Sequence, residues 1–326
     1  MVGVNIASCE LEDGVDRGAF WHRESSLGER LGAKWIGASV YEAQEGRPIW
    51  PYHYHHGVEE WMYVLSGTPI LRDRGGEQPL STGDLVAFAS GELGAHTMRG
   101  PGRFLIFSVG ALGWGEAFVT EYPDSDQIAA APGVRFRRDD AIDSWDERGD
   151  QTSELLNAAP TPAPGNATPV VNLSSIPEQL GTGLGTPELG SQLGARTWAV
   201  TLRDLAAGDA PEPYHYSWCR EEWALVLGGT PTLRHPDGED VLDPGALVCF
   251  TEGPAGAHRF QNHGDTTARL ITFSTPIGRP SSTFYPDDET VVIHIPAYGG
   301  YRFSLDDQVD DYWDGEPGAA IRGSRC

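Results

Sequence analysis

The sequence predicts an all-β protein of two tandem domains, and three observations support this fold class. The 326-residue chain repeats itself, because Tyr52-His53-Tyr54-His55 followed by Glu59-Glu60-Trp61 returns as Tyr214-His215-Tyr216-Ser217 followed by Glu221-Glu222-Trp223. Its apolar segments are short, rich in β-branched and aromatic residues, and separated by Gly or Pro. No long stretch has the 3.6-residue period of a helix. This combination is typical of an antiparallel sandwich or closed barrel.

The extent of the repeat sets the domain organisation. Leu31-Gly32-Ala33-Lys34 matches Leu193-Gly194-Ala195-Arg196, and even Asn5 has a counterpart in Asn172. The segment between the copies is rich in Ala, Pro, Thr, Ser and Asn without a hydrophobic period, which is typical of a linker. We therefore expect an N-terminal domain over residues 1–150, a linker over 151–169 and a C-terminal domain over 170–326. Each domain is large enough to bury its own core.

Individual elements follow from the same pattern. Strands are predicted where apolar runs lie between turn signals, at residues 61–65, 85–88, 104–109, 247–250 and 269–273. Helix should be minor, and the two candidate segments are acidic and near the ends of the domains, at residues 142–147 and 305–313. Trp61 and Trp223 occupy equivalent positions in the repeat, and packing within the domain is their expected role.

Composition excludes several classes of function. The formal net charge is −24, with 47 acidic and 23 basic residues, so the Lys/Arg footprint that nucleic acid binding requires is absent. The N-terminus has neither a basic start nor an apolar run, and no 18 consecutive apolar residues occur. We expect a cytoplasmic protein with no membrane or nucleic acid partner. The 4 cysteines form no Cys-x-x-Cys pair, so neither a disulfide framework nor a thiolate zinc site is indicated.

Histidines and a glutamate with the chemistry of metal ligands lie at the centre of the first repeat. Residues two apart in a strand point to the same face, so His53 and His55 are expected to project together. Glu60 follows after a short turn, and His96 comes from a distant strand. Three imidazoles and one carboxylate suit divalent Fe, Mn, Zn, Ni or Cu and leave open coordination positions. Glu59 is the alternative carboxylate.

The second repeat departs from the first at one position, where Ser217 replaces the second histidine. His215, Glu222 and His258 remain, and two histidines with one carboxylate can still hold a metal. We expect this second site to be weaker than the first. Cys219 shares the strand parity of His215, and a small buried thiol is its expected role.

The spacing of these residues resembles a known family. The stretch from His53 through Glu60 to Gly67 resembles the first motif of the cupin superfamily, and the stretch from Gly83 to His96 resembles its second motif. Four residues separate Gly91 from His96, which is longer than usual in the family, and both repeats share this feature. The chain resembles two-domain members, the bicupins, of the largely uncharacterised bacterial type.

The resemblance implies two tandem cupin jelly-roll β-barrels, each with a divalent transition metal in its mouth. In that family the positions that match His53, His55, Glu60 and His96 are the metal ligands. Seed-storage cupins keep the barrel and lose the metal, which is the structural alternative. Burying three histidines and a glutamate without a cation would leave several costly polar groups to pair, so we expect metal binding in the first repeat.

Three classes of function remain open from the sequence. The first is a metal-dependent oxidoreductase of the dioxygenase or oxidase kind acting on a small organic molecule, with Glu60 able to relay a proton. The second is an isomerase or lyase acting on a sugar or carboxylic acid, in which the metal is a Lewis acid only. The third is a non-catalytic small-ligand or storage protein. Met62, Val64 and Met98 indicate a partly hydrophobic pocket.

Overall fold

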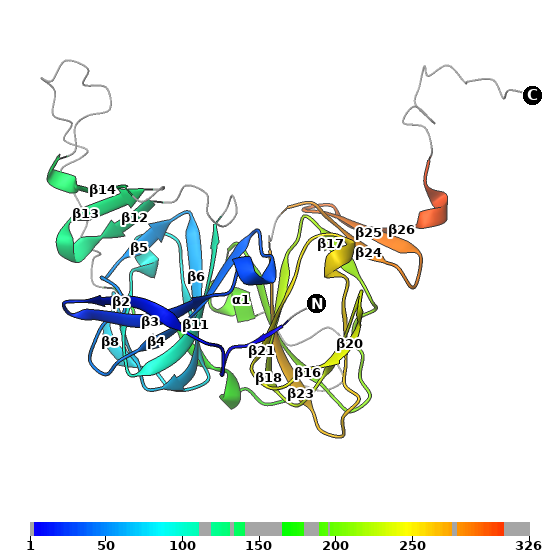
Figure 1. The fold of residues 1–326 in the computed structure, drawn as a ribbon. Coiled ribbons are helices and arrows are strands. Elements are labelled where there is room, and N and C mark those ends of the chain that lie inside the picture. The colour runs from blue at the N-terminus through cyan, green and yellow to red at the C-terminus, as the bar shows by residue number, and fades with distance from the viewer. Residues whose placement is uncertain are drawn as a thin grey trace, which may run out of the picture.

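Two similar β domains lie side by side in the computed structural model, which describes residues 3–110, 119–130, 134–140, 165–178, 189–194, 196–275 and 279–309 (Figure 1). Within these residues, each domain has one large sheet, one three-stranded sheet and one four-stranded sheet. All strand pairings between the named strands are antiparallel, as the pattern predicts. The facing sheets of each domain enclose a jelly-roll core, and they remain separate sheets rather than one continuous hydrogen-bonded ring.

The N-terminal domain is built around a seven-stranded sheet. Its strands, in sheet order, are β15 (Val170–Asn172), β9 (Asp84–Phe88), β6 (Val58–Gly67), β11 (Gly102–Gly110), β4 (Ile36–Ala43), β3 (Phe20–Ser26) and β2 (Glu12–Arg17). The three-stranded sheet contains β10 (Thr97–Arg99), β7 (Ile70–Asp73) and β8 (Gly76–Pro79). The four-stranded sheet contains β14 (Val134–Arg137), β13 (Gln127–Ala130), β12 (Val119–Tyr122) and β5 (Tyr54–His56).

The C-terminal domain repeats this plan with a five-stranded large sheet. Its strands, in sheet order, are β1 (Val4–Asn5), β21 (Ala246–Phe250), β18 (Glu222–Gly228), β23 (Ala268–Ser274) and β16 (Ala199–Leu205). The three-stranded sheet contains β20 (Gly238–Val241), β19 (Thr232–His235) and β22 (Arg259–Gln261). The four-stranded sheet contains β17 (Tyr216–Trp218), β24 (Ser281–Tyr285), β25 (Thr290–Ile295) and β26 (Gly299–Ser304).

Helices are short in the described part of the chain, as expected. They are α1 (Leu189–Gln192) and the 3₁₀ turns η1 (Glu29–Leu31), η2 (Glu92–Gly94), η3 (Pro123–Ser125), η4 (Arg138–Asp140), η6 (Leu173–Ser175), η7 (Pro254–Gly256) and η8 (Leu305–Asp307). The predicted helix at 142–147 lies outside the described residues, and of the one predicted at 305–313 the described part contains only η8. None of the described helices is long and apolar enough to span a membrane.

Two short strands are exchanged between the domains. β1, at the N-terminus, pairs with β21 of the C-terminal domain, and β15 pairs with β9 of the N-terminal domain. Asn5 and Asn172, which match in the repeat, stabilise these two strand pairs through equivalent side-chain hydrogen bonds. The Asn5 side chain donates to the carbonyl of Pro244 at 2.9 Å, and that of Asn172 donates to the carbonyl of Thr82 at 3.1 Å. Each domain therefore completes its large sheet with a strand from outside its own repeat.

The outer faces of the two large sheets pack against each other and form one core across the domain boundary. Phe107 lies 4.4 Å from Phe273 between ring centroids, and Trp61 lies 6.1 Å from Trp198. Trp61 and Trp223 are 1% and 0% exposed and both belong to this shared core. The two tryptophans therefore pack between the domains, which the repeat alone could not indicate.

A buried glutamate from each domain ties this interface to the backbone of the other. The carboxylate of Glu221 accepts hydrogen bonds from the backbone N–H groups of residues 34, 35 and 36, at 2.6, 3.2 and 3.0 Å. Glu59 is its counterpart in the repeat, and it accepts from the backbone of Arg196 and Thr197 and from the Thr197 hydroxyl. The two carboxylates are 1% and 4% exposed, so each satisfies buried N–H groups that no strand pairing reaches.

Candidate metal centre

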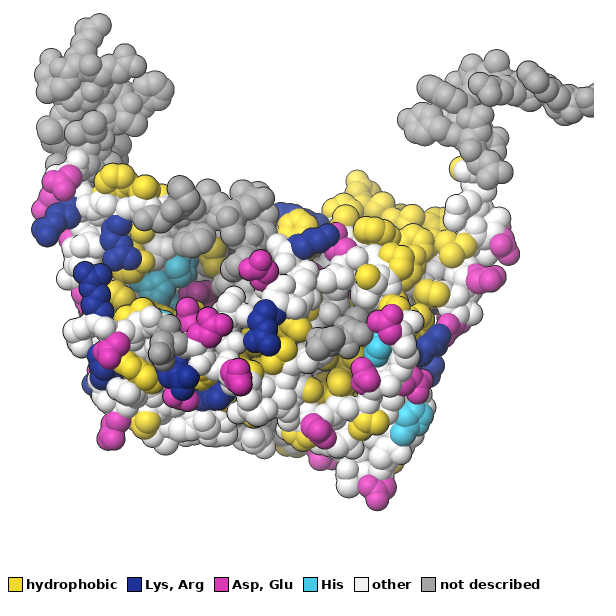
Figure 2. Space-filling view, viewed as in Figure 1, with side chains coloured by type: hydrophobic (Ala, Val, Ile, Leu, Met, Phe, Trp, Pro, Cys, Tyr) yellow, Lys and Arg dark blue, Asp and Glu magenta, His cyan; other side chains and the backbone are white. Residues whose placement is uncertain are grey.

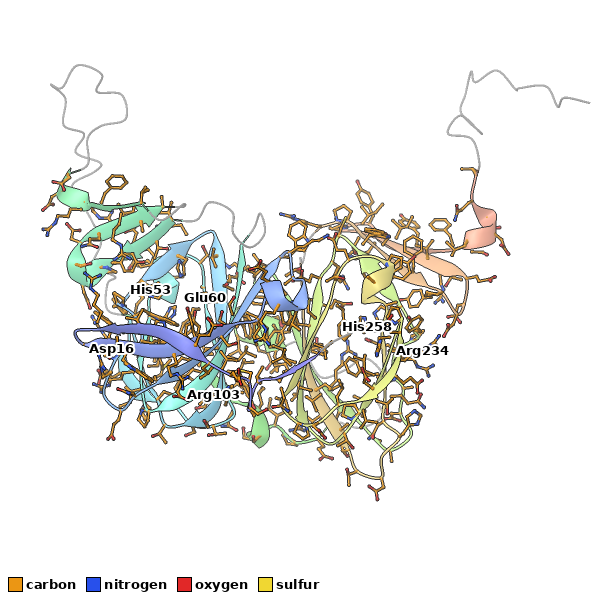
Figure 3. All side chains as sticks on the ribbon, viewed as in Figure 1. Asp16, His53, Glu60, Arg103, Arg234 and His258 are labelled. Atoms are coloured by element: carbon orange, nitrogen blue, oxygen red, sulfur yellow. The ribbon has the colours of Figure 1, made fainter. Side chains whose placement is uncertain are left out.

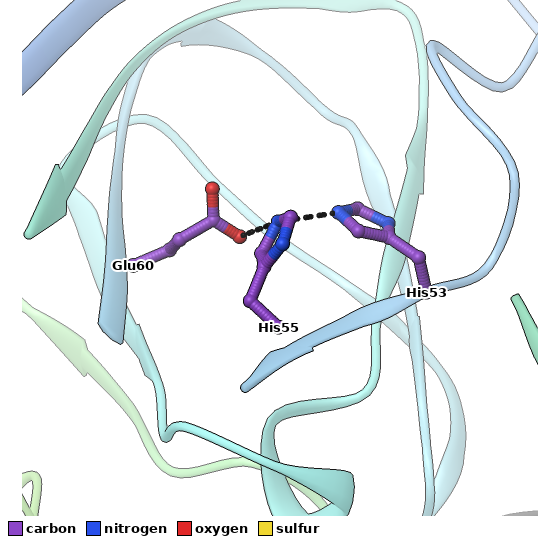
Figure 4. A group of neighbouring side chains, drawn as sticks. All are labelled: His53, His55 and Glu60. Atoms are coloured by element: carbon purple, nitrogen blue, oxygen red, sulfur yellow. Dashed lines mark hydrogen bonds and ion pairs between the residues drawn. The ribbon is translucent and has the colours of Figure 1, made fainter. Parts of the chain in front are cut away.

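The residues predicted to bind metal in the first repeat come together within the N-terminal domain, and Figures 3 and 4 show His53 and Glu60 of this set. His53 Nε2 lies 3.1 Å from His55 Nε2, and Glu60 Oε2 lies 3.3 Å from His55 Nε2 and 3.6 Å from His96 Nε2. Ligand atoms at about 2.1 Å from a shared cation would be separated by about 3.0–3.4 Å. His53, His55 and Glu60 therefore have nearly the spacing of a coordination sphere, and His96 lies next to Glu60.

Backbone pairing explains why two of these rings meet. His53 and His96 are direct partners across an antiparallel bridge, with N–H to carbonyl bonds of 3.0 and 2.9 Å in the two directions. Directly opposed side chains in such a pair lie on one face of the sheet. The two imidazole centroids are 4.8 Å apart, and the ring of His96 also stacks on Phe88 at 3.7 Å. Packing fixes both rings before any ligand binds.

Each histidine of this cluster is held through its other ring nitrogen. The Nδ1 atoms of His53 and His96 lie 3.0 and 2.8 Å from the carbonyl oxygens of Pro51 and Gly94. A carbonyl can only accept, so these Nδ1 atoms carry the protons and the Nε2 lone pairs face the centre. His55 Nδ1 lies 2.8 Å from Thr120 Oγ1. Anchoring of this kind orients metal-binding imidazoles in proteins.

The pKa shifts of His53, His96 and Glu60 favour the charge states of metal ligands. Burial, together with the neighbouring His96 and His55, lowers the pKa of His53 to about 3. Burial also lowers the pKa of His96. For Glu60, burial opposes ionisation, but the surrounding histidines outweigh it and place its pKa at about 2. Burial lowers the pKa of His55, and the adjacent Glu60 more than reverses this effect.

One buried oxygen of the cluster is surrounded by histidine nitrogens. Glu60 Oε2 is buried, with His55 Nε2 at 3.3 Å and His96 Nε2 at 3.6 Å. His53 Nε2 and His55 Nε2 are in contact, and two lone pairs that face each other repel unless a proton or cation lies between them. A divalent cation at this point would satisfy the carboxylate oxygen and both nitrogens at once. The residues present therefore fit a transition metal.

Glu59 and Glu60 have separate places, as the spacing predicts. Glu60 points into the domain with the histidines, whereas Glu59 lies on the opposite face of β6 and binds the backbone of residues 196 and 197. Alternation along a strand produces this separation. The competing carboxylate is thus a contact between the domains.

The longer spacing before His96 forms a tight turn. The extra residues make η2, and its last residue, Gly94, supplies the carbonyl that accepts from His96 Nδ1. A Cβ at Gly94 would lie 1.9 Å from the carbonyl oxygen of Ala89, so only glycine fits. Gly256 of η7 has the same constraint, with 1.8 Å to the carbonyl oxygen of Thr251. The shared insertion therefore orients the third histidine in both domains.

The second domain keeps this arrangement with one of the predicted ligands replaced. His215 Nε2 and His258 Nε2 lie 3.7 and 3.9 Å from Glu222 Oε2. Ser217 stands where the first domain has His55, and its hydroxyl pairs with Thr283 at 3.1 Å. The guanidinium of Arg220 lies 4.0 Å from Glu222 and competes with a cation for that carboxylate. The three residues could still hold a metal, with fewer donors than the first cluster.

The first cluster opens into a cavity of about 470 Å³, whereas the cavity at the second has only about 30 Å³. Histidine surface is visible in a hollow of the N-terminal domain (Figure 2). The wall of the large cavity combines aromatic and apolar side chains with hydroxyls and one guanidinium, from Tyr41, Trp50, Ile106, Tyr122, Ser39, Ser108, Thr120 and Arg135. Of these two cavities, the first has far more room for a small organic molecule.

The pocket walls differ from the sequence prediction. Met62, Val64 and Met98 were expected at the pocket, but they are 1%, 0% and 0% exposed and lie in the core of the N-terminal domain. Cys219, expected to be a buried thiol, is exposed and adopts φ 60°, close to the φ 78° of its counterpart Gly57. Both errors arise because alternation along a strand predicts the face on which a side chain lies but not how deeply it is buried.

Replacement of Thr120 by valine tests the anchoring of His55. Thr120 is 2% exposed, so valine fills the same space and removes only the hydroxyl. We expect the affinity of the first domain for a divalent metal to fall by about 10–100-fold, since removing the hydrogen-bond partner of a metal-binding imidazole usually lowers affinity by that factor. Competition with a chromophoric chelator measures the change. Thr283→Val is the matched control because its hydroxyl contacts Ser217, and an unchanged affinity in Thr120→Val would contradict the role.

Comparison with known proteins gives a family for part of the chain. Residues 39–109, which include all four residues of the first cluster, match the model of the cupin domain family. A search of curated protein sequences found no match.

Similar solved structures include a sugar phosphate isomerase of the cupin superfamily from Silicibacter pomeroyi, which is 24% identical with a TM-score of 0.36 over 42% of this chain and 88% of that chain. A putative sugar phosphate isomerase from Acidithiobacillus ferrooxidans is 23% identical with a TM-score of 0.36, covering 38% of this chain and 77% of that chain. A variant of Bacillus subtilis oxalate decarboxylase is 14% identical with a TM-score of 0.49, covering 85% of this chain and 79% of that chain. The N-terminal domain thus contains a cupin domain over residues 39–109, and the C-terminal domain repeats its arrangement of sheets.

Proposed function

We propose that the N-terminal domain is a metal-dependent oxidoreductase of the dioxygenase or oxidase kind that acts on a small organic molecule. One observation carries this proposal: His53, His55 and Glu60 of the donor cluster line a cavity of about 470 Å³. His53, His55, Glu60 and His96 would hold the cation. The C-terminal cluster, with fewer donors and about 30 Å³ of space, has a subsidiary role.

The side chains around the centre have separable tasks. A divalent transition metal bound there supplies Lewis acidity and open coordination positions. Pro51, Thr120 and Gly94 hold the imidazoles in one orientation through Nδ1. Glu60 is ionised, and its carboxylate could relay a proton if its contact with the metal loosens. Tyr41, Trp50 and Ile106 form a wall that limits water on one side of the cavity.

A second candidate is an isomerase or lyase that uses the cation as a Lewis acid only. The hydroxyls of Ser39 and Ser108 line the cavity beside Glu60 and favour a substrate rich in oxygen atoms, such as a sugar or a hydroxy acid. Proton transfer by Glu60 would then be the main chemical step. In both candidates the partner is a small molecule, and the net charge of −24 disfavours nucleic acid.

Metal analysis followed by a substrate screen tests the proposal. Protein purified without added metal is expected to contain iron, copper, nickel or manganese, and to consume oxygen with a member of a panel of small organic acids and sugar phosphates. Zinc with turnover that is equal in air and under nitrogen would instead support the isomerase or lyase. Protein that neither contains nor binds a metal would contradict both and support a non-catalytic binding or storage role.

A further inference from the structure

A single arginine lies in the wall of the large cavity. Arg135 is in β14 and lines the cavity together with His53, His55 and Glu60. Its guanidinium carbon lies 4.2 Å from the ring centroid of Tyr122, and that ring packs on His53 at 6.0 Å with an angle of 24°. The guanidinium is therefore connected to the donor cluster through one aromatic ring.

The second domain contains the same stack, but there the guanidinium is neutralised. Arg302 is the counterpart of Arg135 and lies 4.9 Å from the ring of Tyr285, which lies 6.0 Å from His215. Arg302 donates to the hydroxyl of Thr290 at 2.9 Å and to Asp288 at 3.3 Å. The duplicated arginine thus has a carboxylate partner within its own domain.

Arg135 has no such partner. Ser125 occupies the position that matches Asp288, and no hydrogen bond or ion pair joins Arg135 to another residue in the described part of the chain. Carboxylates outnumber basic groups two to one in this protein, with 47 against 23, so an arginine without a carboxylate partner is unexpected. Stacking on an aromatic face holds the guanidinium while its N–H edge stays available.

The charge within the cavity favours an anion. Glu60 is the one carboxylate among its described lining residues, and Arg135 is the one permanent cation. A divalent metal at the centre would add to the positive charge and exceed the single negative charge of Glu60. A guanidinium binds carboxylate and phosphate through two parallel N–H to oxygen bonds. The hydroxyls of Ser39 and Ser108 can donate to the remaining oxygens.

We propose that Arg135 sets the substrate class of the first domain, which is a small organic anion. The carboxylate or phosphate of the substrate pairs with the guanidinium of Arg135, and its other end reaches the centre formed by His53, His55, Glu60 and His96. This inference rests on the proposed function and extends it. The C-terminal domain does not select anions in this way, because Arg302 is already paired.

Calorimetric titration of the metal-loaded protein tests the proposal with defined probes. The probes are malonate for a carboxylate and inorganic phosphate for a phosphate, with malonamide as the neutral analogue of malonate. We expect Arg135→Gln to weaken binding of the preferred anion by about 10–100-fold, the usual effect of removing a charge-assisted pair. The affinity of Arg135→Lys for the anion should lie between that of Arg135→Gln and that of the wild type. Arg302→Gln is the matched control and should bind like the wild type.

Two results would overturn the inference: equal affinity of both anions for the wild type and Arg135→Gln, or malonamide binding as tightly as malonate. The same titrations after removal of metal separate this inference from the proposed function. Anion binding that depends on Arg135 in metal-free protein supports the role of Arg135, even if no metal-dependent turnover is found. Turnover that is unchanged in Arg135→Gln would uphold the enzyme and refute the anion selectivity. Because Arg135 is exposed, the variant should fold, and circular dichroism checks this.

Discussion

Protein with His55 replaced by serine is expected to lose the metal of the first domain at concentrations that saturate the wild type. His55 Nε2 contacts both His53 and Glu60, so its removal takes a neutral donor from the middle of the cluster. Loss of groups that merely orient a ligand costs about 10–100-fold in affinity, and loss of the ligand itself should cost at least as much. Metal content per chain, measured after dialysis, gives the result, and turnover should be abolished with it.

The reciprocal variant, Ser217→His, tests the equivalent position in the second domain. It restores the missing imidazole opposite Thr283, which occupies the place of Thr120. We expect metal content in the second domain to rise without a change in activity. Full activity in His55→Ser, combined with loss of activity in His258→Ala, would show that the working site is in the C-terminal domain.

Replacement of Glu221 by alanine is expected to lower the free energy of unfolding by about 3–5 kcal/mol, the usual cost of breaking a buried charged contact. Its carboxylate accepts from three consecutive backbone N–H groups of the other domain and from Trp223 Nε1 at 3.1 Å. Alanine leaves these donors buried without partners. Urea unfolding followed by tryptophan fluorescence measures the loss.

Matched variants define the origin of this effect. Glu59→Ala removes the equivalent contact and should destabilise by a similar amount, whereas Glu10→Ala changes an exposed glutamate and should have little effect. Glu221→Gln keeps one acceptor oxygen, so its loss should be smaller than that of Glu221→Ala. A change below about 1 kcal/mol in Glu221→Ala would mean that water replaces the carboxylate.

Much of the fold was predictable because the signals are local. The five predicted strands at 61–65, 85–88, 104–109, 247–250 and 269–273 lie within β6, β9, β11, β21 and β23. Strand alternation was enough to bring His53 and His55 to one face and to separate Glu60 from Glu59. These inferences need only the period of a strand and the spacing of a motif.

The remaining features depend on contacts between distant parts of the chain. The pairing of Asn5 with the second domain and of Asn172 with the first leaves no local trace, except that the two asparagines match in the repeat. His22 is 8% exposed, and its Nδ1 lies 2.9 Å from the carbonyl oxygen of the distant residue Ile49. The difference between Arg135 and its duplicate Arg302 lies in a carboxylate, Asp288, for which the described residues around Arg135 offer no counterpart.

The exchanged strands also set the order in which the two large sheets can be completed during synthesis. Val4 pairs with Leu247, so the first strand leaves the ribosome long before its partner has been made. At about 5–20 residues per second, the interval is about 12–50 seconds. β15 is made soon after its partner β9, so the N-terminal domain can complete its large sheet first. The five-stranded sheet of the C-terminal domain is complete only when β1 returns to its edge.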